Sequence, residues 1–156
     1  MSDVLGQVPL LQQEKPYSCG AAALRAVLLH YDLDLSEELL ASLLDLKPTG
    51  TDMDVVASLA RQLGFQAAIL SFRQEPGGVS WEAVDGFLRA QVPLMIGVSS
   101  WNHPGQYHFV VLTAHEGGYA DLMDPNTLGN RRVLSEAELA ERWRGYVYRG
   151  IAIQPA

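Results

Sequence analysis

Residues 12–31 read QQEKPYSCGAAALRAVLLHY, and this stretch contains Cys19, the only cysteine of the chain. A polar loop ends at Ser18, and from Cys19 to Tyr31 apolar residues occupy most positions around a helix, as in a helix buried in a core. A thiol in the first turn of a helix feels the partial positive charge of unpaired backbone N–H groups, which favours the thiolate. The stretch therefore predicts a buried helix with a nucleophilic cysteine at its start.

The chain from residue 32 to residue 91 is predicted to be mainly helical. Capping residues and apolar spacing predict four elements: a helix over 37–46 after the cap Ser36, a helix from the cap Thr51 through Leu63, a strand over Phe65–Leu70, and a helix over 81–91 after the cap Ser80. The apolar stripe of the first of these helices is expected in the core: Leu39, Leu40, Leu43 and Leu44. The nearby acidic residues are expected on a solvated surface: Asp34, Glu37 and Glu38.

Beyond residue 92 the apolar periodicity shortens to that of strands. It predicts strands over Pro93–Val98, Tyr107–Thr113 and Tyr119–Asp124, a helix over 136–143, and a last strand over Tyr146–Ile153. Gly117-Gly118 forms a turn signal between the second and third strands, which favours an antiparallel meander, and Ser135 with Glu138 has the form of a capping box. Helices in the first half and strands in the second indicate an α+β fold, expected as one domain over residues 1–156.

The composition of the chain indicates which kinds of partner and which cellular location to expect. The chain has 156 residues, is 48% hydrophobic, and carries a net charge of −7 without a Lys/Arg cluster, so we expect no nucleic acid partner. The N-terminus lacks the basic and apolar regions of a signal peptide, and no apolar run approaches the roughly 20 residues that span a bilayer, so no membrane partner is expected either. A single cysteine cannot form an internal disulfide, which fits the cytoplasm.

Three further polar residues can complete a site around Cys19. His108 begins a strand-like run and is the candidate base, and Asp124, sixteen residues later, can reach it on an adjacent strand and orient its ring. Gln13, six residues before Cys19, can donate an N–H that, with the backbone N–H of Cys19, binds the oxyanion of a tetrahedral intermediate, although the neighbouring Gln12 is an equal candidate. These residue types are those of a thiol hydrolase that passes through a thioester.

Each assignment has a plainer alternative. Cys19 can be a small buried apolar residue, Asp124 can cap an Asp-Pro-Asn turn, and His103, on the loop before the second strand, competes with His108 as the base; His30 and His115 are weaker rivals. Among the His and Cys residues, only His103 and His108 have a spacing suited to a metal, and one such pair is weak evidence for a metal site. We therefore expect no metal and no cofactor.

Taken together, the motifs resemble the papain-like bacteriocin-processing peptidases, which cleave double-glycine leader peptides, and their stand-alone relatives. The matching residues are Gln13-x5-Cys19-Gly20-x-Ala22-x-Leu24, then His108-Phe109-Val110-Val111, then Asp124-Pro125. The resemblance implies a papain-like cysteine protease fold, in which an N-terminal helical lobe packs on a C-terminal antiparallel sheet. It also implies Cys19 as nucleophile, His108 as base, Asp124 as orienting residue and Gln13 in the oxyanion hole.

The same resemblance sets the expected function. It implies a cysteine peptidase that acts on a peptide or small amide. Acyl transfer or deamidation by the same triad, and a catalytically silent peptide-binding module, are the alternatives. Exporter-fused members of the family commonly have Asp before the cysteine, where this chain has Ser18. That difference bears on the substrate. Because the exporter-fused members carry transmembrane helices and an ATPase, and this sequence shows neither a membrane span nor a phosphate-binding loop, we expect the chemistry of the family without its role in secretion. The sequence carries no signal for an oligomeric state.

Overall fold

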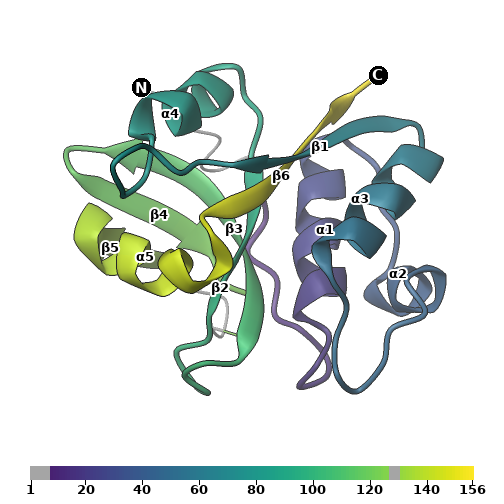
Figure 1. Cartoon of the computed structure of the whole chain (residues 1–156). Helices are drawn as coiled ribbons and strands as arrows, with labels where there is room; N and C mark the ends of the chain where they lie inside the picture. Colours follow the sequence, from purple (N-terminus) through teal and green to yellow (C-terminus); the bar gives the residue numbers. More distant parts are fainter. Residues whose placement is uncertain (1–7, 127–130) are drawn as a thin grey trace.

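The structure, a computed structural model, describes residues 8–126 and 131–156. It consists of a six-stranded sheet with helices on both sides (Figure 1). The strands are β1 (Phe65–Ser71), β2 (Leu94–Ser99), β3 (Tyr107–Glu116), β4 (Tyr119–Met123), β5 (Arg131–Ser135) and β6 (Arg149–Pro155). Their order is β1-β6-β2-β3-β4-β5, and every neighbouring pair is antiparallel. The predicted meander is confirmed in β2, β3 and β4.

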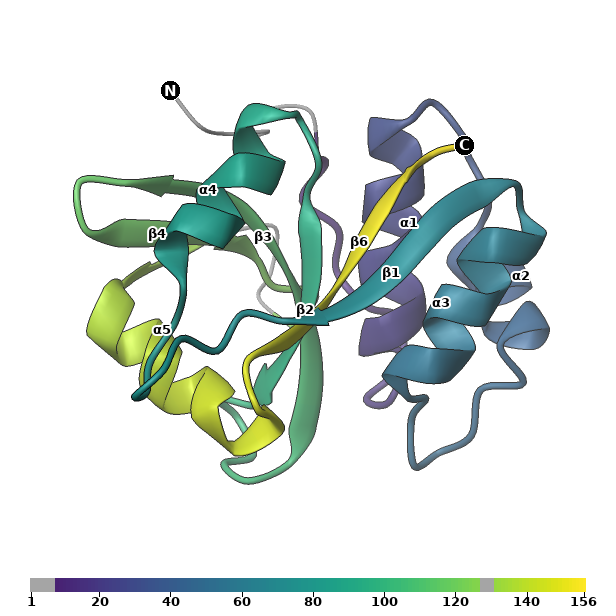
Figure 2. The ribbon, with the colours of Figure 1, turned by 45° about the horizontal axis from the view of Figure 1, so that its top comes forward.

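The helices divide between the two faces of the sheet (Figure 2). They are α1 (Cys19–His30), α2 (Glu37–Leu43), α3 (Met53–Gln62), α4 (Trp81–Arg89) and α5 (Glu136–Trp143), followed by a 3-10 turn, η1 (Arg144–Tyr146). One core cluster joins α1, α2 and α3 to Phe109 and Val111 of β3, whereas a second joins α4 and α5 to Val110 and Leu112 of the same strand. Alternate residues of β3 therefore serve opposite cores.

Helix starts agree with the predicted caps, with one exception. Ser36, Ser80 and Ser135 accept from the backbone N–H three residues later, and Ser135 with Glu138 forms the predicted capping box. α3, however, is capped by Asp52 and not by Thr51, because the Asp52 carboxylate accepts from Val55 N at 3.0 Å. A carboxylate at this position also favours the positive end of the helix.

Three features of the sheet were not predicted correctly. β3 extends three residues past Thr113, and β5 is an additional strand that pairs with β4. β6 begins at Arg149 and not at Tyr146, because η1 and two residues with positive φ, Val147 and Tyr148, precede it. Of the leucines predicted to lie in the core, Leu40 of α2 and Leu44, just after it, are buried. Leu39 and Leu43 are 44% and 50% exposed, so half of that prediction was wrong.

Within the described residues, none of the helices combines the length and apolar character that crossing a membrane requires.

Candidate active site

Cys19, His108 and Gln13 line one narrow cleft of about 40 Å³. The cleft lies between the start of α1 and the end of the sheet where β3 begins, and the loop after β2 contributes Ser100 and His103 to its wall. β4 ends at Met123, paired with Val111 of β3, so that Asp124 comes to the same end of the sheet as His108. The antiparallel pairing thus brings together residues that are sixteen positions apart in the chain.

Cys19 is the first residue of α1, and the helix approaches the sheet closely at the next residue. A Cβ on Gly20 would lie 2.6 Å from Thr51 Cγ2 and 3.2 Å from the ring of Phe109. Phe109 follows His108 in β3, so the missing side chain at Gly20 lets the start of α1 pack beside the strand that carries the imidazole. The Cys-Gly pair in the sequence therefore has a packing reason.

Among residues 8–126 and 131–156, no side chain caps the first turn of α1. Ser18 occupies the N-cap position, but its hydroxyl lies 3.0 Å from Lys15 O and 3.1 Å from Glu37 Oε2 and makes no capping hydrogen bond. Uncapped N–H groups keep the positive end of a helix available to an anion. The backbone around Cys19 is therefore suited to stabilising negative charge on sulfur or on an oxyanion.

His108 and Asp124 form a short, buried pair. His108 Nε2 lies 2.6 Å from Asp124 Oδ1, and the two residues are 5% and 2% exposed. Burial lowers the pKa of His108, but hydrogen bonds to Asp124 and Cys19 outweigh it and raise that pKa to about 9. Burial raises the pKa of Asp124, but His108, the Asn126 N–H and Arg132 outweigh it and hold that pKa below its usual value. The geometry favours an imidazolium between a carboxylate and the sulfur.

Gln13, and not Gln12, faces the cleft. The backbone N–H of Gln13 donates to Pro125 O at 2.8 Å, which ties this residue to the turn after Asp124, whereas Gln12 is exposed. One N–H of the Gln13 amide donates to Lys15 O at 2.8 Å, and the amide has a second N–H to offer. The placement fits the predicted oxyanion role.

The competing histidines lie in different surroundings. His103 is exposed on the wall of the cleft, while His30 lies at the other end of α1 from Cys19, with Nε2 2.9 Å from Gln91 O. His115 is at the far end of β3, between Asp85 and Glu136. In the described part of the chain no group of three or more His, Cys, Asp or Glu side chains is arranged to hold a metal ion.

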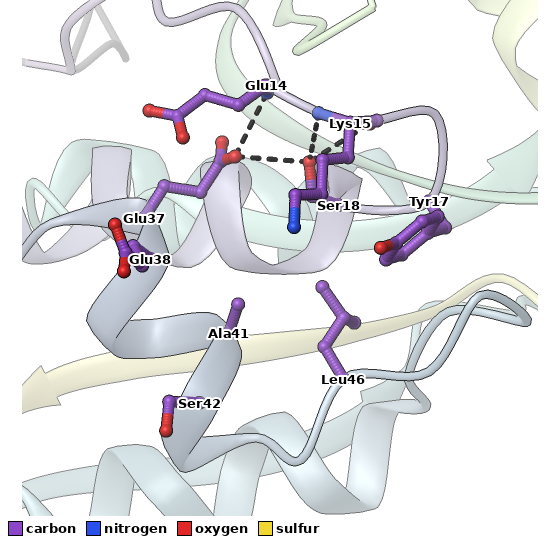
Figure 3. A pocket seen from close by; sticks show the side chains of 9 residues that line it. All are labelled: Glu14, Lys15, Tyr17, Ser18, Glu37, Glu38, Ala41, Ser42 and Leu46. Carbon is purple, nitrogen blue, oxygen red and sulfur yellow. Dashed lines mark hydrogen bonds between the residues drawn. The ribbon is translucent and has the colours of Figure 1, made fainter.

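A second, larger pocket of about 330 Å³ adjoins the loop before Cys19 (Figure 3). Tyr17 lines both this pocket and the cleft, and the Lys15 side chain points into the pocket toward Ala41 (Figure 3). Glu37 is only 5% exposed here, because it accepts from Glu14 N at 2.9 Å and from Ser18 Oγ. Its predicted place on a solvated surface was wrong; burial raises its pKa, and these hydrogen bonds partly offset the rise.

A model of the peptidase C39 family matches residues 7–149, almost the whole chain. The chain belongs to the peptidase C39 family. This C39 chain is 31% identical over 144 residues to the probable functional amyloid protease FapD of Pseudomonas fluorescens, a match that covers 89% of the chain. The chain spans 58% of the length of that relative.

Solved structures agree with the C39 assignment at the level of the fold. The peptidase domain of Streptococcus ComA, a bi-functional ABC transporter, superposes with a TM-score of 0.77 at 19% identity, over 96% of this chain and 99% of that one. A double glycine motif protease from a PCAT transporter, solved with a leader peptide, superposes with a TM-score of 0.72 at 22% identity, over 96% and 92%. The expected papain-like fold of a cysteine peptidase is thereby confirmed.

Sequence reasoning missed one residue that touches the site of this C39 domain. Arg132 of β5 donates from Nε to Asp124 Oδ2 at 3.1 Å. The burial of Asp124 is visible only in the structure, and β5 itself was not predicted. Without that strand there was no reason to bring residue 132 near residue 124.

Proposed function

We propose that this C39 domain cleaves a peptide bond with Cys19 as nucleophile, His108 as base and acid, and Asp124 as orienting residue. The observation that carries the proposal is the buried pair of His108 Nε2 and Asp124 Oδ1 at 2.6 Å, in which His108 shares the cleft with Cys19. Since Nε2 is taken by Asp124, Nδ1 is the ring nitrogen left for the sulfur. The raised pKa of His108 favours the thiolate–imidazolium pair before substrate arrives.

The reaction follows from these positions. The Cys19 thiolate attacks the carbonyl carbon, and the resulting oxyanion accepts hydrogen bonds from the Cys19 backbone N–H and the Gln13 amide. The His108 imidazolium then gives its proton to the leaving amine, which leaves a thioester on Cys19. Neutral His108 takes a proton from water, the hydroxide adds to the thioester, and release of the carboxylic acid restores the thiolate and imidazolium.

The proposed substrate is a peptide with small residues before the cleaved bond. A free volume of about 40 Å³ at the sulfur leaves little room for a side chain. The solved relative in complex with a leader peptide is named for a double glycine motif, and FapD is named a probable protease. On the single-cysteine argument we also propose that cleavage takes place in the cytoplasm.

A panel of synthetic peptides, read by mass spectrometry, tests the proposal. We expect cleavage after Gly-Gly and at least tenfold slower cleavage when Phe replaces the second glycine. Cys19→Ala should abolish turnover because it removes the nucleophile, and Asp124→Asn should lower kcat by several orders of magnitude, as loss of the orienting carboxylate does in other triads. Leu43→Ala, an exposed position on α2, is the control. Turnover by Cys19→Ala at the native rate would refute the assignment.

A further inference from the structure

Arg132 contacts the oxygen of Asp124 that His108 does not use. Asp124 Oδ1 accepts from His108 Nε2 at 2.6 Å and from Asn126 N at 2.9 Å, whereas Oδ2 accepts from Arg132 Nε at 3.1 Å. A carboxylate that is 2% exposed needs partners at both oxygens, because water cannot replace them. Arg132 therefore completes the hydrogen bonding of the proposed orienting residue.

The Arg132 guanidinium is itself held in place. Its backbone is paired with Leu122 of β4, the strand that leads into Asp124. The guanidinium carbon lies 4.2 Å from the ring centre of Trp101, and Arg142 of α5 lies 5.0 Å from the same ring. Arg142 also donates to Ser100 O at 2.9 Å, which anchors the loop that carries Trp101. Stacking on an aromatic ring fixes the plane of a guanidinium and so the direction of its N–H groups.

We propose that Arg132 is a positioning residue of the peptidase site: it holds the Asp124 carboxylate at the angle at which Oδ1 meets His108, while Trp101 holds Arg132. The proposal rests on the function proposed above for Cys19, His108 and Asp124. Arg132 acts through Asp124, whose Oδ2 accepts its hydrogen bond. Against the opposing effect of burial, and together with the larger effect of His108, the hydrogen bond from Arg132 also helps to lower the pKa of Asp124.

Alkylation of Cys19 by iodoacetamide tests the proposal without a known substrate. The chain has a single cysteine, so the rate of adduct formation, followed by mass spectrometry between pH 5 and 10, reports on that thiol alone. In the wild-type protein we expect reactivity well below pH ~8.5, the midpoint of a free thiol, and an ordinary profile in His108→Ala. Arg132→Met should react about tenfold more slowly at pH 6, with Arg131→Met, the neighbouring exposed arginine of β5, within twofold of wild type.

A double-mutant cycle separates positioning from simple stabilisation. If Arg132 acts through Asp124, Arg132→Met slows alkylation about tenfold in the wild-type background and less than twofold in Asp124→Asn, because the group it positions has already lost its charge. An equal effect in both backgrounds would overturn the inference. Arg132→Lys keeps the charge but lacks the planar fork, so it should recover part of the rate; it also serves as the readout if Arg132→Met does not fold.

The two proposals fail differently. An ordinary thiol profile in the wild-type protein would refute the Cys19–His108 pair, whatever Arg132 does. If the wild-type protein shows an activated pH profile of alkylation, and Arg132→Met and Arg131→Met both show the same profile, only the role of Arg132 is refuted. Cleavage kinetics give an independent check, since loss of positioning lowers kcat and leaves KM within about twofold.

Discussion

Gly20 places the nucleophile because it has no side chain. The start of α1 lies against Thr51 and Phe109, and a methyl group at position 20 would overlap Thr51 Cγ2 at 2.6 Å. Overpacking of this kind typically costs about 1–3 kcal/mol, and here the strain falls directly beside Cys19 and His108.

Gly20→Ala should therefore lower both stability and Cys19 reactivity. We expect a loss of about 1–3 kcal/mol in the free energy of unfolding, measured with urea, and slower alkylation by iodoacetamide. Gly86→Ala in α4 is the matched control: a Cβ there meets nothing within 4 Å, so the better helix propensity of alanine should stabilise the protein by about 0.5–1 kcal/mol. Equal effects at the two glycines would contradict the packing argument.

Most residues of the candidate site were predicted from the sequence. Cys19, His108 and Gln13 line one cleft, and Asp124 pairs with His108. Cys19, His108 and Asp124 each lie near the start or end of a predicted helix or strand, and Gln13 lies in the loop just before the helix of Cys19. The choice between Gln12 and Gln13 needed the backbone bond to Pro125 O, which no local pattern encodes. Arg132 could not be predicted for the same reason, because its contact with Asp124 depends on the pairing of two strands.

Among the elements, α4 and α5 are joined to the far end of β3 through His115. The two ring nitrogens of His115 lie 2.7 Å from Asp85 Oδ1 of α4 and 2.6 Å from Glu136 Oε2 of α5, and the ring stacks on Trp81 at 4.4 Å. Burial lowers the pKa of His115, but hydrogen bonds to Glu136 and Asp85 outweigh it and raise the pKa. Two carboxylate acceptors suit an imidazolium, which can donate from both nitrogens.

The stabilising effect of this contact should depend on pH. Because the folded pKa of His115 lies above the unfolded value of about 6.5, its contribution is complete below that pH and is lost as pH rises through the folded pKa. His115→Gln should thus destabilise the protein more at pH 5.5 than at pH 9 in urea unfolding. Glu141→Gln, at an exposed position of α5, should change little at either pH. If the difference in unfolding free energy between wild type and His115→Gln stayed constant with pH, it would rule out a charged His115 in this contact.

Element boundaries followed from capping and periodicity where both signals were present. The caps of α2, α4 and α5 were predicted, whereas β5 was missed because RRVLS offers too few apolar residues to mark a strand. Its formation is decided by pairing with β4, a non-local contact. The delayed start of β6 depends likewise on the left-handed conformations of Val147 and Tyr148, which no glycine signals in the sequence.

Across the whole molecule, β6 joins two halves. The first half contains α1, α2, α3 and β1, and the second contains α4, β2, β3, β4, β5 and α5. β6 pairs with β1, which packs with α3, and with β2, at the centre of the sheet (Figure 1). Ile151 of β6 is opposite both Ile69 of β1 and Met95 of β2. The helical half thus shares its sheet with the half that carries His108. Since the two halves also share the core around α1, they should unfold together.

Urea unfolding should show this coupling. All three tryptophans, Trp81, Trp101 and Trp143, lie in the second half, so their fluorescence reports on that half, while far-UV circular dichroism includes the helices of the first. We expect one shared midpoint, and Ile151→Ala should lower it equally by both probes, with a loss of about 2–5 kcal/mol. Leu43→Ala, at a position of α2 that is 50% exposed, is the control. Separate midpoints would show that the halves unfold independently.

The position of β6 also bears on when the protein becomes active during its synthesis. Cys19, His108 and Asp124 all leave the ribosome before residues 149–155, yet until those residues emerge β2 has an unpaired edge and β1 has no neighbour in the sheet. Domains assemble as units once their strands are available. A nascent chain from which residues 149–155 have not yet emerged should therefore remain inert, and cleavage should start only after β6 has paired with β1 and β2.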